Sequence, residues 1–307
     1  MLGGIELIAV VGSSNVDLVV SVDHFTKPGE TQACASFSRH PGGKGANQAV
    51  ACKKLGADVF FLSVTGSDGN GEFIREELRK HGVHNALQVS DAPNGFALIE
   101  VASDGQNRII IYGGSNSHLT PELIEKLQND ILRSDLLLIQ NEIPFSSTVK
   151  AAQLFKSKGK LVVFDPAPAQ NISSEIFPYV DIITPNESEM RSLLSKNTSP
   201  EEGIEQLLKL GCENVLLKLG EKGCLFHGKM GQFRVEAFKV NTVDSTAAGD
   251  VFNAAFATEL ERSENIEKSL IFASAAAAIS VTRHGAQPSI PTLAEVNEFL
   301  KSKGIKW

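Results

Sequence analysis

Asp250 is the acid whose setting most suggests chemistry. In VNTVDSTAAGDVFNAAF, residues 240–256, it follows Ala247, Ala248 and Gly249 and opens an apolar helical pattern. Glycine and aspartate are poor helix-interior residues, so propensity does not explain them. A helix N-terminus has free N–H groups and partial positive charge, which small residues expose to an anion. The pattern favours an anion hole beside a carboxylate, although a lone motif of this kind also fits an ordinary capped helix.

Other polar residues follow predicted strands, where short side chains could bind a ligand. Asn15 and Asp17 follow the first strand, Glu142 ends another, and Asn186 and Glu189 open a helix after a fifth strand-like run. Each alone is more often a cap or turn former. In an open α/β sheet the carboxyl ends of the strands meet at the ligand crevice. Together these residues predict a site there.

The elements that must position these residues alternate along the chain. Apolar runs typical of buried strands occupy 5–12, 59–66, 135–142, 160–168, 180–186 and 213–220, and helical patterns include 45–57, 70–83, 147–159 and 199–211. This order predicts a three-layer α/β fold, with a mostly parallel central sheet and helices on both faces.

Two turn-rich regions break this order. Residues 16–37 and 94–112 alternate apolar and polar residues, the second around a hairpin turn at Asp104-Gly105. They predict a small antiparallel β lid; the alternative is an extension of the main sheet's edge. The predicted division is a core of residues 1–14, 38–93 and 113–307 and a lid of residues 15–37 and 94–112.

Composition excludes several partners. The 307-residue chain is 42% hydrophobic and carries a net charge of −7 without a basic run, which argues against nucleic acid and anionic membranes. No stretch is apolar enough to span a membrane, and the first apolar run is interpreted as a strand, not a signal peptide. The cysteines form no C-x-x-C pair, which favours reduced thiols in the cytoplasm.

Common phosphate and hydrolase motifs are missing. Gly43-Lys44 is followed by Gly45, so the hydroxyl of a Walker A motif is absent. The first strand ends in GSSN rather than G-x-G-x-x-G, and neither H-E-x-x-H nor G-x-S-x-G occurs. These absences argue against dinucleotide-binding, zinc peptidase and serine hydrolase functions.

The chain resembles the ribokinase-like (PfkB) carbohydrate kinase family, which also contains fructokinases and adenosine kinase. PGGKGANQAVACKKLGA and DSTAAGDVFNAAF match its two signatures, with FDPAPA, TPNESE and KLGEKG between them. GGKGAN, DPAPA and RHGAQPSIP resemble the ribokinase branch. The resemblance covers essentially the whole chain.

The resemblance implies roles on the sugar side. Asp250 would be the general base, and Ala247, Ala248 and Gly249 the anion hole for the transferring phosphate. The implied sugar ligands are Asn15, Asp17, Gly43, Lys44, Asn47, Glu142 and Asp250, with Ala97 and Ile99 providing apolar lid surface.

It also implies a nucleotide site, two metal ions and a dimer. ATP would contact Asn186, Glu189, Lys218, Leu219, Gly220, Glu221, Lys222, Gly223, Gly249 and Ser274, and Asn186 and Glu189 would help to hold phosphate and hydrated Mg²⁺. A K⁺ loop would comprise Asp244, Thr246, Ser280, Arg283, Gly285 and Ser289, mainly through carbonyl oxygens. Family members pair their lids, so a homodimer is expected.

The expected activity is ATP-dependent phosphorylation of D-ribose at its 5-hydroxyl. A related kinase for 2-deoxyribose, fructose or a nucleoside is the first alternative, because pocket changes of one hydroxyl often discriminate only modestly. A kinase-like sugar sensor that binds without turnover is the second, and the retention of Asp250 argues against it.

Overall fold

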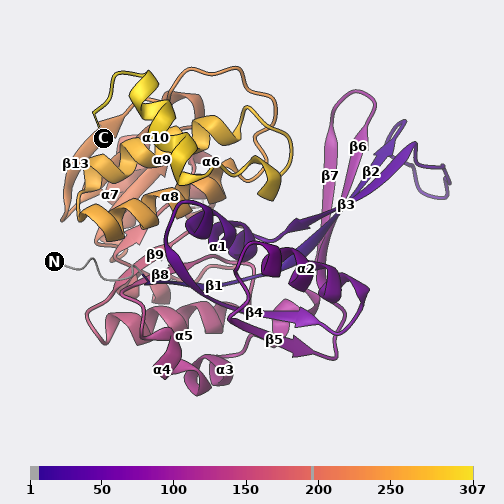
Figure 1. Cartoon of the computed structure of the whole chain (residues 1–307), viewed down its shortest axis with the longest axis horizontal. Helices are drawn as coiled ribbons and strands as arrows, with labels where there is room; N and C mark the ends of the chain where they lie inside the picture. The colour runs from indigo at the N-terminus through magenta and orange to yellow at the C-terminus, as the bar shows by residue number, and fades with distance from the viewer. Residues whose placement is uncertain (1–6, 195–196, 307) are drawn as a thin grey trace.

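The computed structural model describes residues 7–194 and 197–306, which build two separate sheets (Figure 1). The larger sheet has nine strands, in the order β13 (Gly231–Val235), β12 (Cys224–Gly228), β11 (Asn214–Lys218), β10 (Ile182–Ile183), β9 (Leu161–Phe164), β8 (Leu136–Ile139), β1 (Leu7–Val11), β4 (Asp58–Gly66) and β5 (Ala86–Ser90). All pairs from β5 to β11 are parallel, and β12 and β13 add an antiparallel edge. The predicted, mostly parallel sheet is confirmed, while the start of its first strand, residues 5–6, lies outside the described residues.

Helices cover both faces of this sheet, as the alternating pattern predicts. Ile8 and Val10 of β1 join one hydrophobic core, and Ala9 and Val11 join the other. This split follows because successive strand residues point to opposite faces. Both residue sets are fully buried, so the architecture has three layers.

One face carries the helix that contains Asp250 and the helices packed beside it. They are α1 (Lys44–Lys54), α2 (Gly69–Lys80), α8 (Ala248–Ser263), α9 (Ile266–Ser280) and α10 (Leu293–Ser302). The other face packs against α3 (Pro121–Lys126), α4 (Gln128–Ile131), α5 (Phe145–Lys156), α6 (Glu187–Leu194) and α7 (Pro200–Lys209). Local sequence sets several of these bounds: α7 begins at Pro200 behind a capping box formed by Ser199 and Glu202.

The smaller sheet comes from the two turn-rich regions and projects away from the core (Figure 1). Its order is β3 (Ser36–Gly42), β2 (Asn15–Val22), β6 (Gly95–Ala102) and β7 (Asn107–Tyr112). The alternative of an extended main sheet is therefore wrong. The outer pairs are antiparallel, but the central pair, β2 with β6, is parallel. The strands run in the same direction because each leaves the core at its own N-terminal end.

The strand β3 is longer than the sequence indicates. It pairs with β2 as far as Gly42, opposite Asn15, so residues 38–42 belong to the smaller sheet although the predicted division assigns them to the core. An alternating pattern that ends in Pro41-Gly42 gives little sign of a strand. The division of the chain into core and lid remains a prediction.

Candidate active site

Asp250 lies in the first turn of α8, in an unusual helix start. Ala247, the N-cap residue, adopts a left-handed conformation with φ of 58°, and no side chain caps the helix. A left-handed alanine is strained, so the surrounding structure must hold it in place. The Asp250 side chain is buried, with 4% of its surface exposed. A buried carboxylate thus sits at the positive end of a helix whose first turn carries small side chains.

Amide groups from α1 hold both oxygens of this carboxylate. Asn47 Nδ2 donates to Asp250 Oδ2 at 3.0 Å, and Gln48 Nε2 donates to Oδ1 at 3.1 Å. Burial raises the pKa of Asp250 above its ordinary value, while the positive charge of Lys44 and the two amide donors oppose the rise. The carboxylate is therefore fixed in direction, and the amide donors and Lys44 favour its charged form against burial.

The predicted sugar ligands meet around the start of α1. Glu142 Oε2 accepts from Ser13 Oγ at 2.6 Å and from the Lys44 backbone N–H at 2.9 Å. Asn15 Oδ1 accepts from Asn116 Nδ2 at 2.7 Å. Polar groups from β2, the segment after β8 and the start of α1 thus lie close together, as the strand-end argument predicts.

Gly43 is required by this close packing. Its φ is 89°, and a Cβ built on it would lie 2.6 Å from the backbone nitrogen of Asn15. Any side chain would displace β2 or the start of α1.

Charges in this cluster influence one another strongly. Burial, followed by the charges of Glu142 and Asp250, raises the pKa of Asp17 to about 6. The pKa of Lys44 is raised above its ordinary value, chiefly by Asp250 and also by Asp165 and Glu142. One lysine therefore faces several carboxylates, an arrangement typical of functional sites.

Register places the two apolar lid residues on the face of Asp17. Asp17 pairs with Ala97, and Val19 pairs with Ile99, on adjacent strands β2 and β6. Side chains two apart on a strand share a face, so Ala97 and Ile99 lie on the same side as Asp17. Their contact with a sugar remains a prediction.

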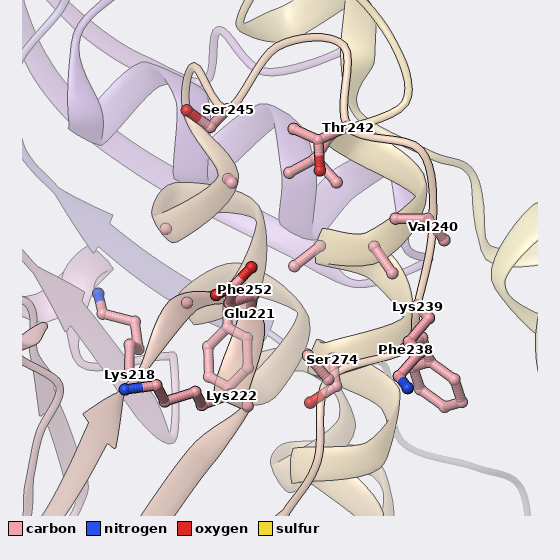
Figure 2. Close-up of a pocket in the computed structure, with 18 residues that line it drawn as sticks. Lys218, Glu221, Lys222, Phe238, Lys239, Val240, Thr242, Ser245, Phe252 and Ser274 are labelled. Atoms are coloured by element: carbon pink, nitrogen blue, oxygen red, sulfur yellow. The ribbon is translucent and has the colours of Figure 1, made fainter.

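A pocket of about 720 Å³ lies beside the start of α8 (Figure 2). Many predicted nucleotide and anion-hole residues line it: Lys218, Gly220, Glu221, Lys222, Gly223, Ala248, Gly249 and Ser274. Its size and apolar walls fit a nucleotide-sized ligand.

The sequence did not indicate the pocket's apolar walls. In Figure 2 the Phe252 ring lies between Lys218 and Lys222 on one side and Ser274 and Phe238 on the other. Phe252 belongs to the continuous apolar pattern of α8, in which a wall residue looks the same as a core residue.

Three predicted nucleotide residues do not line this pocket: Asn186, Glu189 and Leu219. Leu219 is buried, with 8% exposed. Asn186 and Glu189 cap α6 reciprocally, the backbone N–H of each donating to the other's side chain at 2.8 Å. An isolated parallel β-bridge between the backbones of Asn186 and Lys218 places this cap next to β11. Burial raises the pKa of Glu189, and the positive charge of Lys218 opposes the rise.

The predicted cation residues form one linked loop and several local contacts. Asp244 Oδ1 accepts from Thr246 Oγ1 at 2.6 Å, and Oδ2 accepts from the Gly285 N–H at 2.8 Å. These bonds join the loop before α8 to the loop after α9. Ser280 and Ser289 bond to nearby carbonyls, whereas Arg283 pairs with Glu295 at 2.6 Å and points its charge there.

A buried polar network was missed by the sequence analysis. Gln48 also donates to Asp165 Oδ2 at 3.0 Å, Gln140 Nε2 donates to Gln48 Oε1 at 2.6 Å, and Lys218 Nζ lies 3.3 Å from Asp165 Oδ1. Asp165 follows a buried strand in FDPAPA, so the strand-end argument could have found it. Gln48 sits within an alanine-rich helical stripe and gives no such signal.

Comparisons with known proteins agree with this geometry. The model of the pfkB family of carbohydrate kinases matches residues 5–293. Ribokinase from Haemophilus influenzae is 42% identical over 96% of this chain and 99% of that one. The solved ribokinase of Thermotoga maritima has a TM-score of 0.91 and 49% identity over 96% of this chain and 99% of its own. Arabidopsis thaliana ribokinase, solved with ribose and ATP, has a TM-score of 0.88 and 34% identity over 96% and 98%.

The fold and the site define an α/β phosphotransferase, and the chain belongs to the PfkB family of carbohydrate kinases. Within residues 7–194 and 197–306, no helix has the length and apolar character needed to cross a membrane.

Proposed function

We propose that this protein transfers the γ-phosphoryl group of ATP to the 5-hydroxyl of D-ribose, giving D-ribose 5-phosphate and ADP. The observation that carries the proposal is the position of Asp250. Its carboxylate lies between the polar cluster around Lys44 and the pocket lined by Ala248 and Gly249. The similarity to ribokinases, one of them solved with ribose and ATP, supports these two substrates.

Asp250 would take the proton from the sugar hydroxyl as that oxygen attacks phosphorus. Phosphoryl transfer asks the protein mainly for positioning and charge stabilisation. The small first turn of α8 would receive the transferring phosphate, and a raised pKa suits a group that must accept a proton near neutral pH. Asn15, Asp17, Lys44, Asn47 and Glu142 would hold the sugar hydroxyls.

Two residues would serve hydrated Mg²⁺ bound to the ATP phosphates. Mg²⁺ keeps several waters and takes few protein oxygens, so a carboxylate beside the phosphate site fits its chemistry. Glu189 supplies such oxygens next to Lys218, with Asn186 orienting it. The ion, when bound, neutralises phosphate charge.

The loop that Asp244 closes fits a K⁺ ion. Hard cations prefer oxygen ligands. The segment before α8 offers the Asp244 carboxylate and the Thr246 hydroxyl, and the Gly285 N–H ties the segment after α9 to it. The described residues contain no group of three or more His, Cys, Asp and Glu side chains that could hold a metal, so carbonyl oxygens would have to contribute. Arg283, Ser280 and Ser289 would contribute through their backbones.

We further propose a cytoplasmic homodimer that pairs through the smaller sheet, acting as a lid. Exposed apolar side chains lie on both of its faces, each more than 40% exposed: by register Phe37, Ile110 and Tyr112 share one face, and Ile109 and Ile111 share the face of Asp17. The apolar patch of Phe37, Ile110 and Tyr112 on a projecting sheet suits a second copy. The four cysteines are all free, which suits a reducing compartment.

An ADP-release assay across a sugar panel tests the substrate. Ribose should give the highest kcat/KM, ahead of 2-deoxyribose, fructose and a nucleoside, with product confirmed by ³¹P NMR. A higher kcat/KM for one of the other acceptors would replace ribose with that compound. Ribose binding without ADP release would favour a sensor instead.

A further inference from the structure

Gln48 connects two buried carboxylates through one amide nitrogen. Its side chain is fully buried on α1, and Nε2 lies 3.1 Å from Asp250 Oδ1 and 3.0 Å from Asp165 Oδ2. An amide NH₂ group has two hydrogens, so it can donate one to each carboxylate. Asp165 is itself 1% exposed, which leaves both acids dependent on such donors.

Gln140 supports the direction in which this amide points. Its Nε2 donates to Gln48 Oε1 at 2.6 Å, and Gln140 is also fully buried. If the Gln48 amide turned over, its oxygen would face the two carboxylates and its nitrogen would face the Gln140 donor. Both contacts would then be repulsive. The two carboxylates, which can only accept, and the Gln140 donor therefore favour the same orientation of the Gln48 amide.

We propose that Gln48, oriented with the help of Gln140, is a positioning residue that keeps the Asp250 carboxylate charged and fixed in direction. The proposal rests on the proposed function, in which Asp250 acts as the base. Asn47 holds one oxygen of Asp250 and Gln48 the other, so the carboxylate cannot rotate freely. Gln48 also separates Asp250 from the negative charge of Asp165.

The same network extends toward the nucleotide pocket. Lys218 Nζ lies 3.3 Å from Asp165 Oδ1 and 3.4 Å from Asn253 Oδ1, and Lys218 lines the pocket. Asp165 therefore has a cation on one side and the Gln48 amide on the other. This arrangement links the group that would accept the sugar proton to a lysine of the nucleotide site.

Loss of the Gln48 donor should raise the pKa of Asp250. Hydrogen bonds to a carboxylate favour its charged form, and burial together with Asp165 disfavours it. The charged groups around Asp250 come from several elements: Lys44 on α1, Asp17 on β2, Glu142 after β8, Asp165 after β9, Glu189 on α6 and Lys218 on β11. These charged groups remain in a Gln48 variant, so a shift in the pKa of Asp250 would result from the loss of the amide donor.

The test is the pH profile of Gln48→Leu, which removes the amide donor and leaves an aliphatic side chain one atom shorter. We expect the acid limb of the log kcat profile to move to higher pH by about one unit, a typical value for the loss of one hydrogen bond to a charged group. On that limb kcat should fall roughly 10-fold and recover toward wild type at higher pH. KM for ribose and ATP should change little. A uniform loss at every pH would overturn the proposal.

Two further variants guard against a folding defect. Gln140→Leu leaves Gln48 in place but frees its amide, so it should shift the limb in the same direction by less. Gln153→Leu makes the same substitution at an exposed position of α5 and should match wild type. If Gln48→Leu does not fold, an unshifted limb in a folded Gln140→Leu contradicts the proposal.

Carboxyl ¹³C NMR of aspartate-labelled protein separates this proposal from the proposed function, because it needs no turnover. The signal lost in Asp250→Asn identifies Asp250, and the pKa at which this signal titrates should be higher in Gln48→Leu. If wild type does not phosphorylate ribose, the proposed function fails while a shifted titration still supports the effect of Gln48. If ribose is phosphorylated and the titration does not move, only the positioning proposal fails.

Discussion

Lys44 is the cation that allows several acids to share the site. Burial alone would lower the pKa of a lysine, but Asp250, Asp165, Glu142 and Glu189 together raise it. The four carboxylates would otherwise repel one another at short range. At the scale of single residues, the positive charge of Lys44 therefore offsets the negative charges of these carboxylates.

The charge of Asp17, which lies near other carboxylates, destabilises the folded state. Its pKa is raised to about 6, so the folded state binds its proton more tightly than the unfolded state. Stability is therefore lost as pH rises from about 4 through about 6. Asp17→Asn should stabilise the protein by about 2 kcal/mol at pH 8 and by little at pH 4, while it weakens ribose binding. Urea denaturation at both pH values checks this. The same stability difference at pH 4 and pH 8 would contradict it.

The first turn of α8 is the element on which the phosphate assignment depends. A Cβ added to Gly249 meets only Lys218 Nζ, at 3.7 Å, so a larger side chain fits without a backbone clash. Gly249→Val should therefore fold normally, yet its branches would enter the anion hole. We expect ATP affinity to fall by 1.4 kcal/mol or more, about 10-fold, with an unchanged melting temperature. Gly249→Ala is the smaller control. Wild-type ATP affinity in the folded valine variant would argue against the anion hole.

The loop that Asp244 closes predicts a dependence on K⁺. Replacing Na⁺ with K⁺ at constant ionic strength and excess Mg²⁺ should raise kcat, because an ordered cation would stabilise the loop that leads into α8. Asp244→Ala removes the bonds to Thr246 and Gly285 and should abolish the difference between the salts. Equal wild-type rates in Na⁺, K⁺ and a large organic cation would count against the site.

Elements were predictable where one local signal determined them. Strand runs such as that of β1, the turn at Asp104-Gly105 and the helical pattern that starts at Ser199 appear as expected. The parallel pairing of β2 with β6 was not predictable, because it joins segments far apart in the chain. Likewise, strand ends identified Asn15 and Glu142, but the Gln48 network depends on which three elements meet.

At the scale of the whole molecule, the projecting sheet has two different faces. Asp17, Ala97 and Ile99 share one face, and by register Ile110 and Tyr112 lie on the other. The second face packs Phe96 against Tyr112, with ring centroids 5.3 Å apart, yet leaves Ile110 60% exposed. A partner lid would cover it.

Light scattering tests the dimer. We expect twice the chain mass of 32.9 kDa at micromolar concentration. Ile110→Lys should give the monomer mass, because it places a charge in the apolar patch. Val89→Lys is the matched control, since Val89 is 57% exposed on β5, away from the lid. A wild-type monomer would rule the dimer out, and a dimer that survives Ile110→Lys would move the interface elsewhere.

The turnover of Asp250→Asn with ribose and ATP tests the central claim most directly. The substitution keeps the shape of the side chain and removes the base. We expect kcat to fall by about 100- to 10,000-fold, with ATP affinity and melting temperature close to wild type. A merely structural Asp250 would instead cost about 1 kcal/mol of stability or less and leave turnover intact. A folded Asp250→Asn protein that phosphorylates ribose at the wild-type rate would contradict the account.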